Sequence, residues 1–289
     1  MYDTILVATD GSAAAETAVR SAIALAERFD AAVHAVHVME MGELPPGVED
    51  ADADAFAGRG RTALEEFATA AEEAGIEAGT AMLDVDGPTH RGIVDYATDN
   101  GVDLVVVGTH GRTGLDRFVL GSVAENTLRS SPVPVLTVHE DTPLDPAVGD
   151  VVVPTDGSET ASRAARHAID VAVGAGVGLH VVNVVDLAAG FDDVGSATVL
   201  EALEDAGQAA VDEVVSMAEE AGVEPVEGSV LSGRPHEAIV DYAAEVDAGL
   251  LVVGTHGRSG LDRLLLGSIA ERVVRTAGCP VLGVPGAGQ

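Results

Sequence analysis

The feature that most constrains the fold is an internal repeat with an offset of 146 residues. The glycine-rich stretch Gly108–Val123 recurs as Gly254–Ile269, and twelve of the sixteen positions are identical. The same offset relates Asp10 to Asp156. Solenoid repeats are far shorter than this offset, which is that of a whole domain. A chain of 289 residues therefore holds two copies of one domain.

Short apolar runs alternate with segments of helical periodicity in the first copy. We expect strands at 4–8, 32–38, 78–83, 103–107 and 133–138. We expect a helix of about five turns after Ser12, and further helices at 57–74, 88–100 and 122–130. Acids, prolines and glycines predict a mobile loop at 40–54. The second copy repeats this plan.

Strands that alternate with helices predict a parallel sheet covered by helices on both faces, and fully apolar strands fit burial on both sides. We therefore expect an α/β fold of two tandem doubly wound domains. Each would hold five parallel strands in the order 3-2-1-4-5. The domains would span residues 1–140 and 150–289, and the acidic, proline-containing segment 141–149 would link them.

In such a sheet the ligand binds at the carboxyl ends of the strands, where the strand order reverses. Asp10 follows the first strand and Gly108 ends the fourth, so they should face each other across this crevice. Asp156 and Gly254 should do the same in the second copy. A glycine-rich loop between a strand and a helix can turn its N–H groups toward a phosphate.

Ser122 and Ser268 stand where the helix after this loop should begin. A hydroxyl there can bind an oxyanion, or it can cap the helix. Glu125 and Glu271 lie three residues further on, which fits a capping box that needs no ligand. Asp10 likewise has an alternative, as a residue that only forms a turn.

The spacings Gly108-x2-Gly111-x9-Gly121-Ser122 and Gly254-x2-Gly257-x9-Gly267-Ser268 resemble the nucleotide-binding signature of the universal stress protein (UspA) family, in its ATP-binding branch. An Asp-Gly-Ser after the first strand and a closing Pro-Val-Leu strand strengthen the resemblance. It implies an adenine nucleotide alpha hydrolase-like fold, a stress-response role, and ATP or AMP as ligand.

The resemblance also implies residue roles. The aspartates would lie near adenine and ribose, the main chain of Val38 and Val184 would pair with adenine, and the glycines, serines and next residues would cradle the phosphates. The family often has Pro-Thr-Asp after the first strand, whereas the first copy has Ala8 in place of that proline. The implied nucleotide-binding residues are Ala8, Asp10, Val38, Gly108, Gly111, Arg112, Gly121, Ser122, Val123, Pro154, Asp156, Val184, Gly254, Gly257, Arg258, Gly267, Ser268 and Ile269.

Arg112 and Arg258 suit phosphate, but they can equally pair with the many acids. We expect His110 and His256 to be loop-surface residues, because no base stands at a fixed position beside either. Mg²⁺ could neutralise the nucleotide phosphates. The carboxylates are too numerous for spacing to select metal ligands, so these remain unknown.

The net charge is −33, and all fifteen basic residues are arginine. Such a surface repels nucleic acid and anionic membranes, so we expect neither as a partner. It also suggests adaptation to a salt-rich cytoplasm, the compartment that we expect because no signal peptide or membrane-spanning run is visible. We expect the single cysteine, Cys279, to be a small buried residue.

The main functional hypothesis is a regulatory or stress-response protein that binds nucleotide with little or no turnover. A slow ATPase or phosphotransferase is the first alternative, although the chain has no lysine and hence no P-loop motif. An interaction module without ligand is the second. In the resembled family the final strand mediates dimerisation, so we expect an intramolecular pseudo-dimer of the two domains, which could dimerise again.

Overall fold

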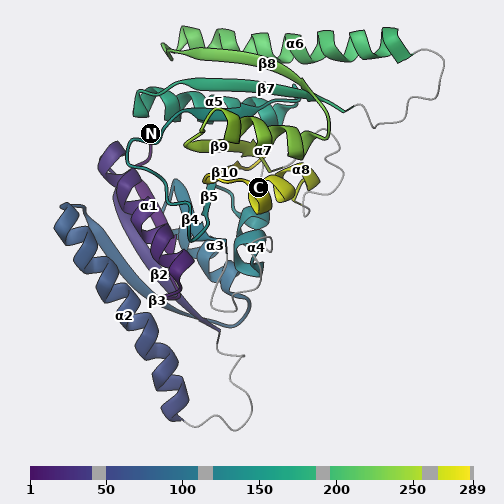
Figure 1. Ribbon diagram of the computed structural model, residues 1–289. Coiled ribbons are helices and arrows are strands. Elements are labelled where there is room, and N and C mark those ends of the chain that lie inside the picture. Colours follow the sequence, from purple (N-terminus) through teal and green to yellow (C-terminus); the bar gives the residue numbers. More distant parts are fainter. Residues whose placement is uncertain (41–49, 110–119, 187–195, 256–265, 287–289) are drawn as a thin grey trace. The chain divides into compact units, whose positions relative to one another are not determined.

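A computed structural model describes residues 1–40, 50–109, 120–186, 196–255 and 266–286. The chain divides into two compact units, Met1–Pro146 and Ala147–Gly288 (Figure 1). We refer to them as the first and second domain. The predicted boundaries at 140 and 150 remain a prediction.

The first domain alternates strands and helices from its start (Figure 1). Its strands are β1 (Thr4–Ala8), β2 (Ala32–Glu40), β3 (Ala78–Val85), β4 (Leu104–Gly108) and β5 (Val135–Val138). Its helices are α1 (Ala13–Phe29), α2 (Asp50–Ala74), α3 (Thr89–Asp99) and α4 (Ser122–Ser130).

The second domain repeats this order of elements. Its strands are β6 (Val151–Pro154), β7 (Leu179–Val185), β8 (Val226–Ser232), β9 (Leu250–Gly254) and β10 (Val281–Val284). Its helices are α5 (Glu159–Ala175), α6 (Ser196–Glu220), α7 (Pro235–Glu245) and α8 (Ser268–Thr276).

Both domains have the predicted doubly wound sheet. The first domain has the order β3-β2-β1-β4-β5 and the second has β8-β7-β6-β9-β10, and neighbouring strands within each are parallel. The strand order reverses beside β1, between β2 and β4, and beside β6, between β7 and β9. The predicted fold class is therefore confirmed, and each domain has one topological switch point.

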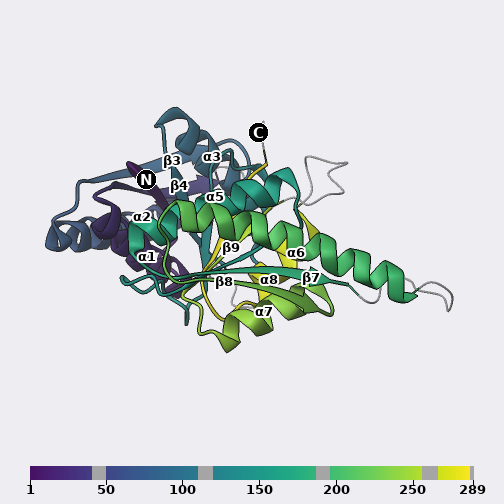
Figure 2. The same ribbon diagram turned by 90° about the horizontal axis from the view of Figure 1, so that it is seen from above.

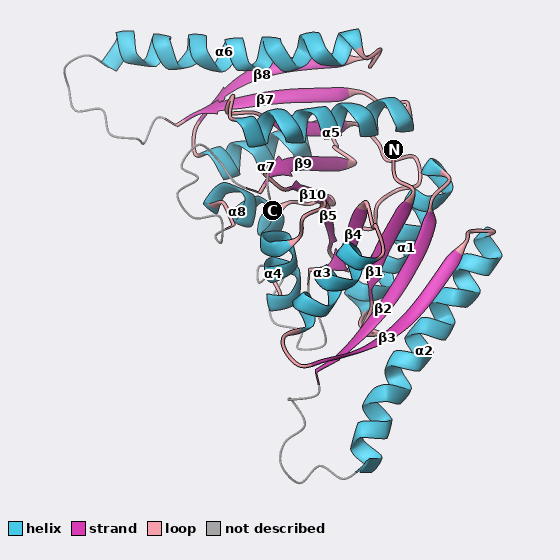
Figure 3. Cartoon of the chain, turned by 180° about the vertical axis from the view of Figure 1, so that it is seen from behind, coloured by secondary structure: helices cyan, strands magenta, loops and turns pink. Residues whose placement is uncertain are grey.

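Small side chains allow the helices to pack closely on apolar strands. Ile5, Leu6 and Val7 of β1 are fully buried, as are Val151–Val153 of β6. Ala18 and Ala22 cover the sheet from α1, and neither is exposed. The long helices α2 and α6 run beside the outer strands of their own domains, α2 along β2 and β3 and α6 along β7 and β8 (Figures 2 and 3).

The predicted loop at 40–54 is wrong at both ends. Glu40 belongs to β2, and α2 begins at Asp50, so only residues 41–49 lie outside the described structure. The prolines and Gly47 that indicated a loop all precede Asp50. Residues 50–54 instead belong to the first turns of α2.

No helix among the described residues is long and apolar enough to span a lipid bilayer.

Candidate ligand site at the carboxyl edge of each sheet

The turn between β6 and α5 holds Asp156 in a defined position. Asp156 Oδ1 accepts a hydrogen bond from the Ser158 N–H at 2.9 Å, and Gly157 between them has a left-handed φ of 74°. The Ser158 hydroxyl in turn caps α5 by accepting from the Ala161 N–H at 3.2 Å. Asp156 thus forms a turn, and the turn sets its carboxylate at the strand end.

The first domain builds the same turn from its own residues. Asp10 Oδ1 accepts from the Ser12 N–H at 3.0 Å, and Gly11 has a φ of 71°. The Ser12 hydroxyl accepts from the Ala15 N–H at 3.3 Å and caps α1. The repeat therefore preserves the hydrogen bonds of this turn as well as its sequence.

A side chain of the neighbouring strand makes a hydrogen bond to the main chain at the start of each turn. Asn183 Nδ2 donates to the Thr155 carbonyl oxygen at 2.7 Å in the second domain. In the first domain His37 Nδ1 lies 2.8 Å from the Thr9 carbonyl oxygen. A carbonyl oxygen can only accept, so His37 Nδ1 carries the proton. Thr9, Thr155 and His37 are buried.

The helix after the glycine-rich stretch begins differently from the predicted capping box. The N-cap of α8 is Gly267, whose N–H donates to the Thr255 carbonyl at 2.7 Å, and Ser268 is the first helical residue. In the first domain Gly121 is the N-cap of α4, and its N–H donates to the Thr109 carbonyl, also at 2.7 Å. Neither N-cap has a side-chain hydrogen bond.

The hypothesis that Ser122 and Ser268 cap these helices is therefore wrong. A capping side chain must belong to the residue before the first helical position, and glycine occupies that position in both domains. The two serines are exposed in the first turn. The N–H groups of a first turn have no intrahelical acceptor, so this end of each helix can accept an anion.

Gly108 and Gly254 have a structural role besides any contact with ligand. A Cβ on Gly108 would lie 2.7 Å from the Ala14 carbonyl carbon, and one on Gly254 would lie 2.8 Å from Thr160 Cγ2. Both contacts are with the first turn of the helix that follows the aspartate. Glycine at the end of β4 and β9 therefore lets the two sides of the switch point approach each other.

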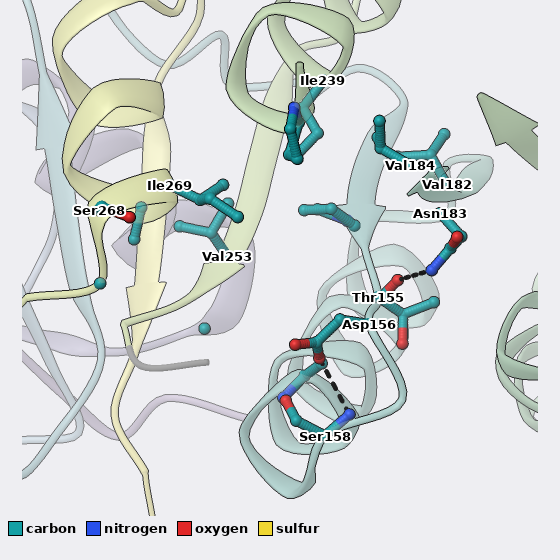
Figure 4. A pocket seen from close by; sticks show the side chains of 16 residues that line it. Thr155, Asp156, Ser158, Val182, Asn183, Val184, Ile239, Val253, Ser268 and Ile269 are labelled. Atoms are coloured by element: carbon teal, nitrogen blue, oxygen red, sulfur yellow. Dashed lines mark hydrogen bonds between the residues drawn. The ribbon is translucent and has the colours of Figure 1, made fainter. Parts of the chain in front are cut away.

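A cavity of about 350 Å³ opens at the carboxyl edge of the second sheet, between the Asp156 turn and the start of α8 (Figure 4). Its polar side holds Asp156, Thr155, Ser158 and Asn183, and Ser268 lies across from them (Figure 4). Aliphatic side chains form the rest of the wall, from strands β7 and β9 and helices α7 and α8. The lining residues are Pro154, Thr155, Asp156, Ser158, Ala161, Val182, Asn183, Val184, Pro235, Ile239, Val253, Gly254, Gly267, Ser268, Ile269 and Ala270.

The electrostatics of this cavity differ from those of the protein surface. Among its described lining residues, Asp156 is the single titratable side chain. The N-terminal end of α8 adds partial positive charge opposite it. In the described part of the chain, no group of three His, Cys, Asp or Glu residues could hold a metal ion. The cavity thus offers an apolar slot, one carboxylate and a region suited to an anion.

Comparison with known proteins identifies the family. The model of the universal stress protein family matches residues 1–139 and again residues 148–285. This chain belongs to the universal stress protein family. A universal stress protein of Mycolicibacterium smegmatis is 31% identical over 303 residues, which cover 97% of this chain and 96% of that relative.

A further relative and a solved structure are similar to this chain. A universal stress protein of Methanocaldococcus jannaschii is 43% identical over 144 residues, covering 48% of this chain and 84% of the relative. The crystal structure of a universal stress protein from Archaeoglobus fulgidus superimposes with a TM-score of 0.73 at 24% identity, over 98% of this chain and 96% of that one. The latter likeness supports the shared two-domain fold.

In the second domain of this universal stress protein, most of the predicted site residues lie together. The cavity is lined by seven of them, namely Pro154, Asp156, Val184, Gly254, Gly267, Ser268 and Ile269. The equivalent residues of the first domain lie at the matching strand and helix ends, namely Ala8, Asp10, Val38, Gly108, Gly121, Ser122 and Val123. Gly111, Arg112, Gly257, Arg258, His110 and His256 lie outside the described residues.

Sequence reasoning missed several lining residues of the universal stress protein cavity. Asn183, which directly precedes Val184, and Pro235 and Ile239 were not among the predicted site residues. Pro235 starts the helix that follows β8, so its place at the carboxyl edge follows from the topology. That topological argument could have found Pro235 and Ile239, whereas nothing in the sequence indicated the hydrogen bond of Asn183.

Proposed function

We propose that each domain binds one adenine nucleotide at the carboxyl edge of its sheet, in a regulatory or stress-response role with little or no turnover. The observation that carries the proposal is the cavity of the second domain, in which Asp156 and the start of α8 face each other across the switch point. Its volume of about 350 Å³ falls within the usual range for small-molecule sites.

The chemistry of the wall suits the three parts of a nucleotide. Val182, Val184 and Ile239 form an apolar slot for a flat base. Asp156 can accept hydrogen bonds from ribose hydroxyls. The first turn of α8, with Ser268, suits the phosphates because its N–H groups point toward the ligand. Adenine, and ATP or AMP in particular, comes from the resemblance of the glycine motif to the ATP-binding branch of the family.

Low turnover follows from the composition of the described lining. Phosphoryl transfer to water needs a group that positions or deprotonates the attacking oxygen. Asp156 is the single titratable candidate among the described lining residues, and its Oδ1 accepts from the Ser158 N–H. We therefore expect bound ATP to persist, and an ATPase or phosphotransferase activity to be weak.

Mg²⁺ is the metal that this proposal includes. A chain with a net charge of −33 repels a triphosphate at long range. Mg²⁺ coordinated by the phosphates themselves would reduce this repulsion without a protein cage. Molar salt would reduce it further by screening.

Nucleotide recovered from the native protein tests the proposal. The protein would be purified in molar KCl with Mg²⁺ and denatured, and released nucleotides would be quantified by chromatography. We expect close to two adenine nucleotides per chain, with ATP recovered intact. No recovered nucleotide, together with no binding of added ATP in equilibrium dialysis, would leave the interaction-module alternative.

We further infer, from the same resemblance, that the final strands Val135–Val138 and Val281–Val284 pair edge to edge as an intramolecular pseudo-dimer. Within its own domain's sheet each is the last strand, β5 pairing with β4 and β10 with β9. Small-angle scattering in molar KCl tests this, because two separated lobes would contradict the pairing. The same measurement would report a homodimer through its molecular mass.

A further inference from the structure

Two side chains outside the predicted nucleotide-binding set connect the outer helix of each domain to the site. Asn183 of β7 directly precedes Val184, and its amide donates to the carbonyl of Thr155, the residue that follows β6. That carbonyl belongs to the residue directly before Asp156. His37 and the Thr9 carbonyl repeat the arrangement 146 residues earlier.

A glycine on the long outer helix packs against each of these side chains. A Cβ on Gly207 of α6 would overlap Asn183 Oδ1, and a Cβ on Gly60 of α2 would overlap the His37 ring. In each domain the outer helix thus covers one side of His37 or Asn183, and a threonine carbonyl accepts a hydrogen bond from that side chain. Both contacts restrict the rotamer, which is what a positioning side chain requires.

We propose that Asn183 and His37 are the positioning residues of the two nucleotide sites, fixing the turn that presents Asp156 and Asp10. The inference rests on the proposed function. Different residue types meet the same requirement because each supplies one N–H donor to a buried carbonyl that would otherwise lack this partner. The main chain contributes as well, since the Thr155 N–H donates to the Val182 carbonyl at 2.8 Å.

Exchange between the domains provides matched variants. Asn183→His and His37→Asn install the partner domain's donor and should retain the turn. Asn183→Leu and His37→Leu remove the donor without adding charge. The glycine on the outer helix is present in both domains, so it leaves the imported residue the same space on that side.

Amide hydrogen exchange of the full chain, measured by NMR in molar KCl without nucleotide, is the first readout. In Asn183→Leu we expect the Gly157 and Ser158 amides to exchange about tenfold faster, because their acceptors belong to the turn. Gly11 and Ser12 in the first domain should be unchanged and serve as the internal control. His37→Leu should produce the reverse pattern, and the exchanged variants should resemble the unmodified protein.

ATP binding is the second readout. Asn183→Leu should weaken one of the two sites about tenfold, and Asn183→His should restore it. Unchanged turn exchange in both leucine variants, or a histidine variant as impaired as leucine, would overturn the positioning role. Faster exchange with unaltered ATP affinity would also overturn it. If the unmodified chain bound no ATP, the proposed function would fail, and the exchange rates would still decide whether Asn183 positions the turn.

Discussion

The two domains use the same hydrogen bonds at the site but different side chains around it. The turns that hold Asp10 and Asp156 agree bond for bond. The residue behind the turn, however, is His37 in the first domain and Asn183 in the second. Two unrelated side chains each donate one hydrogen bond to the same carbonyl position. This indicates that the geometry of the turn is maintained in both domains, whereas the residue type of the donor is not.

The helices that follow β3 and β8 also differ in how they pack on the strands. Gly92 of α3 packs so closely that an added Cβ would lie 2.8 Å from Val85 Cγ1 and 3.2 Å from Val38 Cγ1. The equivalent position in α7 is Ala238, next to the lining residue Ile239. An alanine at this position would thus have to displace Val85 of β3 and Val38 of β2, so glycine lets α3 lie close to both strands. Side chains that only fill space have diverged, whereas those that hold the turn have kept their function.

The largest expected effect concerns salt, and it should affect the first domain more. Residues 1–146 contain 26 acids and 8 arginines, a net charge of −18, against −15 for the remainder. Transfer from molar to about 10 mM salt lengthens the Debye length from about 3 to about 30 Å. The resulting self-repulsion should unfold domains whose total stability is about 5–15 kcal/mol.

Circular dichroism and domain-resolved hydrogen exchange across a KCl series measure this. A spectrum unchanged between molar KCl and dilute buffer would contradict the predicted adaptation to salt. If the second domain unfolded at higher salt than the first, net charge alone would not set the order in which the domains unfold.

A smaller effect is expected at the glycines that end β4 and β9. Gly108→Ala should destabilise its domain by about 2–3 kcal/mol, because the new methyl meets the Ala14 main chain. Gly254→Ala should cost about 1 kcal/mol, because its nearest contact is the Thr160 methyl group, a side chain that can rotate. Denaturant unfolding of both variants in molar KCl checks the difference, and equal costs would refute this account of the two contacts.

Acid should act more strongly on the second domain through His167 on α5, where the first domain has Ser21. Burial lowers the pKa of His167 from 6.5 to about 4. Between these values the unfolded chain binds a proton that the folded chain does not, so the unfolding free energy decreases as the pH falls from 6.5 to 4. Because His167 is partly exposed, we expect a loss of roughly 1–2 kcal/mol.

The variant His167→Gln removes this titration and keeps a side chain of similar size. Its unfolding free energy should depend less on pH between 6.5 and 4 than that of the unmodified protein. Parallel pH profiles for the two proteins would assign the acid sensitivity to other groups.

The smallest effect is expected at Cys279, whose counterpart in the first domain is Val133. Burial raises the pKa of the Cys279 thiol to about 11, so only about 0.1% is thiolate at pH 8. We expect slow reaction with a thiol reagent under native conditions and fast reaction after denaturation. Cys279→Val should change stability by less than about 1 kcal/mol. Cys279 is half-buried in the structure rather than fully buried as predicted, and rapid native labelling would contradict the raised pKa of its thiol.

The sequence by itself determined the duplication, the fold class and the pairing of each aspartate with a distant glycine. Apolar runs and helical periodicity are local signals, and the order 3-2-1-4-5 then places residues 10 and 108 at one edge. The prediction of a loop over residues 40–54 was wrong because proline and glycine indicate a break without fixing where the next helix begins. The capping box failed similarly, since the motif fits a helix that starts one residue later.

Only the tertiary structure decided which side chains complete the site. The hydrogen bond from Asn183 on β7 to Thr155, directly after β6, joins residues 28 positions apart, and its strength depends on register and burial. The need for glycine at 254 comes from Thr160, nearly a hundred residues away in sequence. The wall residue Ile239 belongs to a helix whose first turn the crossover brings to the same edge. Such contacts arise from packing between elements, which composition and periodicity do not encode.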